Sequence, residues 1–444
     1  MESIRSALER GQIQDAIEAL TQLRPADRAE AFSDLDDRDQ AAILPRLGIS
    51  DTADLLEELE DEEAIDVAET LPTGRLADVL DEMEPDEAAD ILGDLSPERA
   101  ASALAEMEDR QDVLPLLSHP DETAGGLMTT SFVALPREAT TAQAIDFLRG
   151  MEPDSETPYY LYVVDAKGRL TGVVGLRDLV VADPAAQLWN IMDEDILYVR
   201  SDTDQEDVAR TFARYDLAAV PVVGTGRRLE GVITYDDIVD VLEEEATEDV
   251  YRLANVSDAD LSIHSPISMA IRRRLPWLYL NTLTALFAAW VISHFEALIA
   301  QLAVLAVFQS VVAGMGGNAA TQSLAITVRA LALGDIELRD AWRPLVKEAV
   351  TGLIHGIAVG SVVGIGVYLW RGSATLGLVL GLALMGNMLV AEFVGTLVPL
   401  VLKALRLDPA LASSVVVTAV TDSVGFSLFL GLASLMLRGG SLQP

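Results

Sequence analysis

The sequence has no cysteine among its 444 residues, which excludes disulfide bonds and thiolate metal sites. It is also poor in positive charge, since 31 Lys and Arg residues stand against 70 Asp and Glu residues, for a formal net charge of −39. A field of that sign serves solubility, repels nucleic acid and attracts cations. Nucleic acid is therefore not an expected partner, whereas a cation is.

The charge is unevenly distributed along the chain. Residues 1–270 contain 20 basic and 62 acidic residues, whereas residues 271–444 contain 11 basic and 8 acidic residues. The first part is predicted to be a soluble, acidic assembly. Its N-terminal segment has no apolar stretch like that of a signal peptide, so we expect this part to stay in the cytosol.

Five apolar stretches follow Arg272, and each reaches the roughly 20 residues that a helix needs to cross a bilayer. They predict a multi-pass protein of the cell membrane with five transmembrane helices, at 275–295, 298–327, 349–370, 374–402 and 411–437. With a cytosolic N-terminus, nine Lys and Arg residues lie at inner ends of the spans and two, Arg371 and Arg438, at outer ends. The positive-inside rule therefore places the N-terminus in the cytosol and the C-terminus outside.

Ionisable residues inside membrane spans are costly and usually functional. Asp422 lies in the fifth span and Glu392 in the fourth, while the glycine-rich second span carries Asn318 and Thr321. Oxygen ligands of this kind suit a hydrated Mg2+ ion, so Asp422, Asn318 and Thr321 are the candidate pore ligands. Helix packing is the alternative reason for the glycines. His355 is interpreted as a hydrogen-bonding residue between helices, and Glu392 either faces the pathway or sits protonated against a neighbour.

Residues 25–117 repeat a short pattern about every 12 residues. Each unit begins with Pro, Asp or Ser and continues with Ala and Leu at helical spacing, as in PDEAADIL and PERAASAL. Short helices of this kind stack into a solenoid. An all-α helical-repeat domain is therefore expected over residues 1–121.

Residues 122–242 contain an internal duplication with the pattern β-α-β-β-α. YYLYVVDAKGRLTGVVGLRDLV corresponds to AAVPVVGTGRRLEGVITYDDIV. The pair resembles tandem cystathionine-β-synthase-type (CBS) domains, an α/β fold whose cleft commonly holds an adenine nucleotide such as ATP. An empty, structural cleft is the alternative. The nucleotide-binding candidates at matching positions are Tyr160, Arg177, Asp178, Thr234 and Asp237.

A dense acidic run covers residues 236–249, just before the membrane part. Like charges three and four residues apart destabilise an isolated helix, so something must offset them. Solvent and salt are one answer, and bound divalent cations are the other. We expect a connecting plug helix at 243–270 and the transmembrane domain at 271–444.

Eight motifs in one order make the chain similar to the MgtE family of Mg2+ channels over essentially its whole length. They are ETAGGLMT (122–129), YVVDAKGRL (162–170), RDLVVADP (177–184), YVRSDTDQEDVA (198–209), DDIVDVLEEEATEDVYRL (236–253), GGNAATQSLAITVRAL (316–331), DPALASS (408–414) and TDSVGF (421–426). The resemblance implies a homodimer with its pore at the dimer axis and Asp422 as the pore aspartate. It also implies regulatory Mg2+ ligands, namely Asp86, Asp90, Asp216, Asp237, Asp240, Glu245, Glu248 and Asp249. Leu217 departs from the family, which can place an aromatic residue there against adenine.

The expected function is Mg2+ uptake with negative feedback. When cytosolic Mg2+ is scarce, the carboxylates repel and the plug helices release the gate, whereas bound Mg2+ stabilises the closed state. The sequence contains no nucleophile–base pair or P-loop, so no enzyme is predicted. The alternatives are a transporter of divalent cations coupled to H+ or Na+, and a CBS nucleotide sensor with a membrane anchor.

Overall fold

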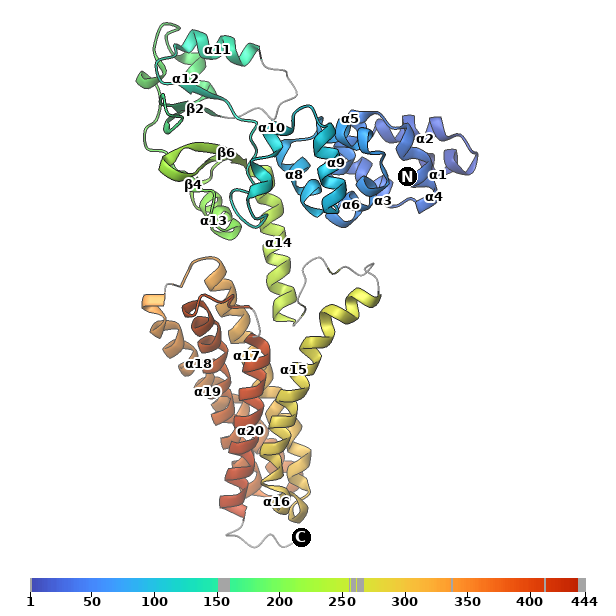
Figure 1. The fold of residues 1–444 in the computed structure, drawn as a ribbon. Coiled ribbons are helices and arrows are strands. Elements are labelled where there is room, and N and C mark those ends of the chain that lie inside the picture. The colour runs from blue at the N-terminus through green and yellow to red at the C-terminus, as the bar shows by residue number, and fades with distance from the viewer. Residues whose placement is uncertain are drawn as a thin grey trace. The chain divides into compact units, whose positions relative to one another are not determined.

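The computed structural model describes residues 2–150, 160–254, 256, 261, 267–336, 338–410 and 413–437. The chain forms two compact units, Met1–Leu242 and Glu243–Pro444. Each unit is described by itself below, and Figure 1 labels their elements. The predicted combination of a helical-repeat domain, a CBS pair and five long apolar helices is confirmed.

The first unit begins with a series of short helices, and each of the repeat units predicted over 25–117 forms one of them (Figure 1). Proline occupies the first position of α3, α8 and α9, where a missing backbone N–H costs nothing. The elements are α1 (Glu2–Glu9), α2 (Ile13–Thr21), α3 (Pro25–Ser33), α4 (Asp37–Ile43), η1 (Leu44–Arg46), α5 (Ile49–Glu57), α6 (Asp61–Thr70), α7 (Thr73–Leu80), α8 (Pro85–Asp94), α9 (Pro97–Glu106), α10 (Arg110–Val113) and η2 (Leu116–Ser118).

Arginines join helices that are about 30 residues apart in the repeat. Arg75 donates hydrogen bonds to the carbonyls of Leu44 (3.1 Å) and Leu47 (2.8 Å), and Arg99 donates one to the carbonyl of Ala68 (2.8 Å). These carbonyls lie at or near helix ends, where no intrahelical donor is left. The arginines therefore stabilise the stack, together with a continuous core of buried Ala and Leu side chains.

The second half of this unit contains two three-stranded sheets of identical topology. In each sheet the first pair of strands is parallel and the second pair is antiparallel, as the β-α-β-β-α pattern predicts. The elements of the first repeat are β1 (Ala134–Pro136), α11 (Thr141–Arg149), β2 (Tyr160–Val164), β3 (Leu170–Gly175), α12 (Leu176–Val181) and η3 (Leu188–Asn190). Those of the second are β4 (Val199–Arg200), α13 (Gln205–Tyr215), β5 (Ala219–Val223), η4 (Thr225–Arg227), β6 (Leu229–Thr234) and α14 (Tyr235–Leu253).

The two repeats exchange their leading segments. The backbone N–H of Thr129, ahead of β1, donates to the carbonyl of Val232 in β6 (2.8 Å), and Val173 N–H in β3 donates to the carbonyl of Asp193 (3.0 Å). The side chain of Met128 fills the space over Gly231, where an added Cβ would lie 2.6 Å from it. Each sheet therefore requires a strand-like segment from the other repeat.

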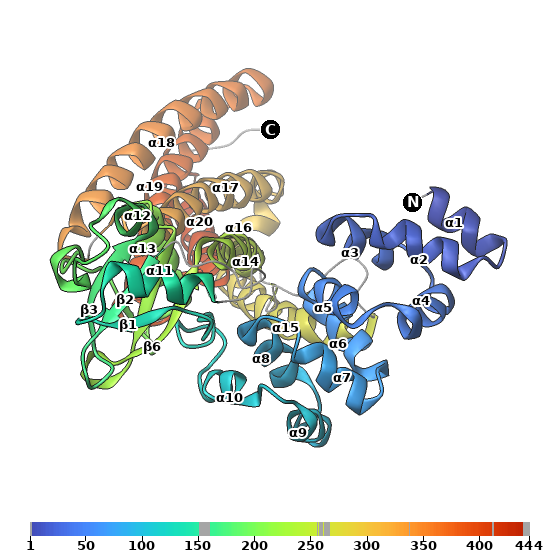
Figure 2. The ribbon, with the colours of Figure 1, turned by 90° about the horizontal axis from the view of Figure 1, so that it is seen from above.

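The second unit is a bundle of long apolar helices, which Figure 1 shows from the side and Figure 2 shows from one end. Among the residues that the structure describes, five helices are long and apolar enough to cross a membrane, which agrees with the predicted number of spans. The elements are α15 (Ile267–Ser293), α16 (Glu296–Gln301), α17 (Val304–Ala332), η5 (Leu338–Asp340), α18 (Trp342–Arg371), α19 (Ala374–Ala404) and α20 (Ser413–Leu437).

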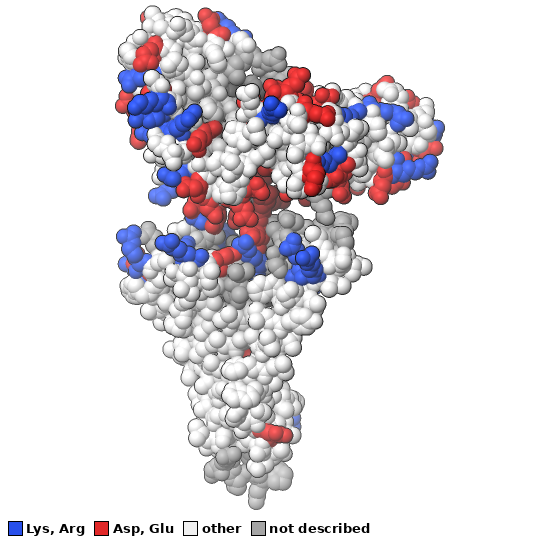
Figure 3. Space-filling view, viewed as in Figure 1, with Lys and Arg blue, Asp and Glu red and all other residues white. Residues whose placement is uncertain are grey.

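The bounds of the second span differ from the prediction. The chain leaves the helix at Leu302, so the short helix α16 is separate and the long helix begins at Val304 rather than at residue 298. Hydropathy does not detect this break, because the residues on both sides of it are apolar. Basic residues gather at one end of the bundle, and the surface along it is almost uncharged (Figure 3).

Helices α18 and α19 pack closely along a row of glycines. A Cβ added at Gly356 would lie 2.7 Å from the Met385 backbone, and one at Gly360 would lie 2.5 Å from the Gly381 carbonyl. Only glycine allows the two backbones to approach this closely. The close approach also brings His355 of α18 within hydrogen-bond distance of Glu392 on α19.

Candidate ion pathway and regulatory sites

One face of α17 is polar and uncovered within a single chain. Asn318 and Thr321 are exposed, although both lie in a helix of a membrane-spanning bundle. The Thr321 hydroxyl donates to the carbonyl of Gly317 (2.9 Å), and an added Cβ at Gly314 or Gly317 would meet nothing. Open space and amide and hydroxyl groups along one face suit the wall of an ion pathway.

Asp422 lies on α20, a helix that packs against α17. Its side chain is half-buried and makes no hydrogen bond or ion pair with any residue that the structure describes. A carboxylate in a membrane span without a cationic partner marks an ion pathway more readily than a structural salt bridge. Within one chain, the described residues do not gather three His, Asp or Glu side chains into a metal site.

Glu392 does not lie on the exposed face of the bundle. Its side chain is 4% exposed, and its Oε1 atom lies 2.7 Å from Nδ1 of His355 on α18. Of the two alternatives that the sequence left open for Glu392, the contact with a neighbour is present in the structure, and its protonation there stays a prediction. The interpretation of His355 as a hydrogen-bonding residue between helices is also confirmed.

A cluster of carboxylates around the buried Asp86 lies in the first unit. Asp86, in the first turn of α8, is 9% exposed, and its Oδ1 atom has no hydrogen-bond partner among the described residues. Burial, and then the charge of Asp237, raise the pKa of Asp86 well above its ordinary value. Burial, and then the charges of Asp86, Asp90, Glu57 and Asp237, raise the pKa of Glu87 to about 9.

Within the described part of one chain these carboxylates do not gather into a closed group of three metal ligands, so a cation here is an expectation that rests on the unpartnered oxygen of Asp86. A cation beside Asp86 would satisfy the unpartnered oxygen and offset the charges that raise these pKa values. Mg2+ keeps several waters, so pairs of carboxylates can hold it without a closed cage of protein ligands. Asp86, Asp90 and Asp237 are candidates from the sequence, and the structure adds Glu57 and Glu87 beside them. In the sequence, nothing around Glu57 or Glu87 distinguishes them from the many other acidic residues of the helical repeat.

The raised pKa values predict a pH-dependent stability that Mg2+ should remove. A carboxyl group whose pKa is higher in the folded chain stabilises the fold below its unfolded pKa, and this contribution is lost as the pH rises through the folded value. For Glu87 that window runs from about 4.5 to about 9. We therefore expect Mg2+ to raise the Tm of the purified chain more at pH 8.5 than at pH 6.

Thermal unfolding with Mg2+ or with NaCl of equal ionic strength measures this effect. Glu87→Gln should reduce the difference between the two pH values, whereas Asp27→Asn, an exposed change on α3, should leave it intact. Equal stabilisation by Mg2+ at both pH values would contradict a cation-binding role of the cluster.

The other predicted regulatory residues are dispersed. Asp216 is exposed at the end of α13 in the left-handed conformation (φ 51°), and Asp240 is exposed on α14. Glu245 is half-buried, Glu248 forms an ion pair with Arg252, and the side chain of Asp249 lies outside the described residues.

The end of α14 is attached to the helical bundle. Arg252 forms an ion pair with Asp408, in the connection between α19 and α20, as well as its pair with Glu248. Leu253 packs against Leu324 and Val328 of α17, together with Ala410. The described part of the connecting helix therefore contacts α17, which carries Asn318 and Thr321, and the connection that leads to α20, which carries Asp422. Asp408 begins the motif DPALASS, and the sequence alone assigned this residue no role.

The nucleotide candidates fall into two equivalent groups, one in each CBS repeat. Tyr160 pairs with Gly175 across the β2–β3 hairpin, directly before the exposed Arg177 and Asp178 at the start of α12. In the second repeat, Asp237 Oδ2 accepts hydrogen bonds from the N–H (3.1 Å) and hydroxyl (2.7 Å) of Thr234. Asp237 thus also caps the start of α14.

A bundle of five apolar helices with carboxylates inside it, joined to an acidic part with a CBS pair, defines a multi-pass membrane protein of the cation-transporter class. Comparison with known proteins agrees. The family model for divalent cation transporters of the MgtE type matches residues 309–432, the model for the MgtE intracellular N domain matches 4–122, and the CBS domain model matches 124–184 and 188–244.

Individual relatives cover most of the chain. The magnesium transporter MgtE of Thermus thermophilus is 40% identical over 74% of this chain and 73% of its own length, and that of Enterococcus faecalis is 38% identical over the same shares. A crystal structure of the cytosolic domain of the Mg2+ channel MgtE in complex with ATP is similar (TM-score 0.51, 38% identity, 54% of this chain and 98% of that one). So is the soluble part of a magnesium transporter (TM-score 0.50, 34% identity, 55% and 96%). The chain belongs to the MgtE family of divalent cation transporters.

Proposed function

We propose that this chain takes up Mg2+ through a pathway between two copies of the chain. The observation that carries the proposal is the half-buried carboxylate of Asp422, unpaired among the described residues, on a helix that packs against α17, whose polar face is uncovered. The relatives named as magnesium transporters support Mg2+ as the transported ion.

A homodimer explains why the pathway residues are incomplete in one chain. Asn318 and Thr321 point away from the rest of their own bundle, which leaves polar groups uncovered in a membrane span. Two copies related by a twofold axis would place both α17 faces and both Asp422 carboxylates around one path. Two carboxylates would then face a hydrated divalent ion. The same arrangement fits a cytosolic N-terminus and an outer C-terminus, with the basic end of the bundle inside (Figure 3).

We infer that cytosolic Mg2+ closes this pathway by binding to the acidic groups of the first unit and of α14. The attachment of Arg252 and Leu253 to the bundle gives α14 a direct mechanical contact with α17. Mg2+ shifts the equilibrium only if it binds the closed arrangement more tightly, and carboxylates brought close together provide that difference. Several ions binding together make the closure steep.

Flux of Mg2+ into liposomes that contain the purified chain tests this function. Uptake should proceed without a Na+ or pH gradient and should stop as internal Mg2+ rises. Uptake that requires either gradient would instead favour the coupled transporter.

We also propose that the CBS pair binds an adenine nucleotide such as ATP, as the similar cytosolic domain solved with ATP suggests. Asp178→Asn should weaken ATP binding to the purified chain about tenfold to a hundredfold, because a hydrogen bond to a charged group contributes about 1.5–3 kcal/mol. Calorimetry measures this, with Asp146→Asn on the exposed side of α11 as the matched control. Unchanged affinity in Asp178→Asn would remove Asp178 from the site.

A further inference from the structure

A polar network connects α17, α18 and α19 within one chain. The Ser323 hydroxyl on α17 donates to Glu348 Oε2 on α18 (2.8 Å), and the Thr327 hydroxyl lies 3.3 Å from that of Thr396 on α19. All four side chains are buried or half-buried in the membrane part. Such groups are costly among apolar helices, so a network of them calls for a purpose beyond packing.

A further polar contact, between His355 and Glu392, joins α18 to α19, and of its two side chains Glu392 is buried while His355 is half exposed. Glu392 is one of the few buried charged side chains of the described bundle, and an isolated carboxylate there would be strongly destabilised. One proton shared between the His355 ring and the Glu392 carboxyl leaves the pair neutral overall. Gly352 allows the approach, because a Cβ there would lie only 3.2 Å from Glu392 Cβ.

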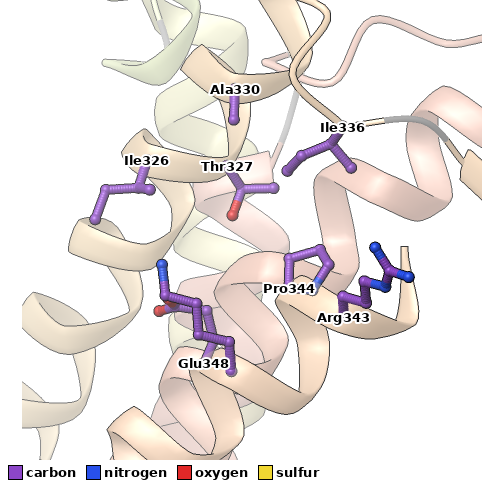
Figure 4. Close-up of a pocket in the computed structure, with 8 residues that line it drawn as sticks. Ile326, Thr327, Ala330, Ile336, Arg343, Pro344 and Glu348 are labelled. Carbon is purple, nitrogen blue, oxygen red and sulfur yellow. The ribbon is translucent and has the colours of Figure 1, made fainter. Parts of the chain in front are cut away.

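A pocket of about 520 Å³ lies at the basic end of the bundle and is lined by Glu348 and Thr327. Thr327 and Glu348 belong to both the pocket and the network, and Figure 4 shows them on its facing helices, with Arg343 at its rim. The charge of Glu348 also acts on Glu392. Glu348 therefore lines the pocket and also lies close enough to Glu392 for its charge to act there.

The charged surroundings of Glu392 are simple. Helix α18 contributes His355 and Glu348, and the cations Arg343 and Lys347 line the pocket outside them. Helix α17 contributes only hydroxyl groups, and no charged residue that the structure describes on α20 acts on Glu392.

We propose that His355, Glu392 and Glu348 form a proton-binding site in each subunit, separate from Asp422 and loaded through the pocket at the basic end. Ser323 and Thr327 transmit its state to α17, the helix that carries Asn318 and Thr321. Mg2+ flux therefore depends on cytosolic pH, a statement that rests on the proposed transport function.

The proton site itself is tested by NMR of the full chain in lipid nanodiscs with 15N-labelled histidine. The sequence has four histidines, so His355→Gln identifies the His355 signal by its loss. We expect the His355 signal to titrate at a clearly different pH in Glu392→Gln than in the unmodified chain, and Glu296→Gln, at the opposite end of the bundle, to change nothing. Identical titration in Glu392→Gln would overturn the site.

Flux in liposomes tests the coupling to transport. Between about pH 6 and pH 8, where an imidazole titrates, we expect Mg2+ flux through the unmodified chain to change severalfold with internal pH. Glu392→Gln and His355→Gln should flatten this profile, and His294→Gln should preserve it. A parallel profile in the first two variants would overturn the coupling. A chain without Mg2+ flux would count against the proposed function alone, since the NMR titration decides the proton site independently.

Discussion

Replacing Asp422 by alanine is expected to reduce Mg2+ uptake to the background of empty liposomes while the protein still inserts and dimerises. Asp422 has no described partner that its loss would leave unpaired, so the fold should tolerate the change. The pathway, in contrast, would lose the only carboxylate that each chain is proposed to offer to the ion. An apolar wall cannot replace the hydration shell of Mg2+.

Two further variants separate charge from structure in this experiment. Asp422→Asn keeps the shape and removes the charge, so it should also abolish uptake. Asp335→Asn, in the exposed connection after α17, changes the same charge outside the bundle and should retain uptake. Undiminished Mg2+ flux through a folded Asp422→Ala protein would remove Asp422 from the pathway.

Amide replacement of the regulatory carboxylates is expected to leave the pathway open at internal Mg2+ concentrations that close the unmodified protein. Amides bind Mg2+ far more weakly than carboxylates do, so internal Mg2+ no longer stabilises the closed arrangement, while the pathway residues and conduction stay intact. Flux at rising internal Mg2+, together with protection of residues 237–249 from proteolysis, measures the effect. The replaced residues are Asp86, Asp90, Asp237, Asp240, Glu245, Glu248 and Asp249.

The same experiment distinguishes specific sites from screening of a charged surface. If Mg2+ acts only by screening, its effect depends on ionic strength, and NaCl at matched ionic strength should protect the chain from proteolysis as well as Mg2+ does. Specific sites require Mg2+ at salt concentrations that already screen exposed charges. Seven amide replacements at exposed positions of the first helices, including Glu9, Glu18 and Asp27, should leave the feedback unchanged. Closure of the regulatory variant at the ordinary Mg2+ concentration would contradict the sensor.

Several features of this protein were readable from the sequence because they are set by local pattern. Apolar length predicted the five spans, a 12-residue period predicted the helical repeat, and the duplication predicted the two sheets. The position of Asp422 in an apolar stretch identified it as a pathway candidate. Each of these properties depends on residues within one segment.

Other features were decided only by the tertiary structure. His355 meets Glu392 across 37 residues, Arg252 meets Asp408 across 156, and Asp86 is buried where the charge of Asp237 acts on it. The sequence alone could not tell whether Glu392 faces the pathway or a neighbour. The physical reason is that burial and partnership determine what a carboxylate does, and both are created by packing segments that are far apart in the chain.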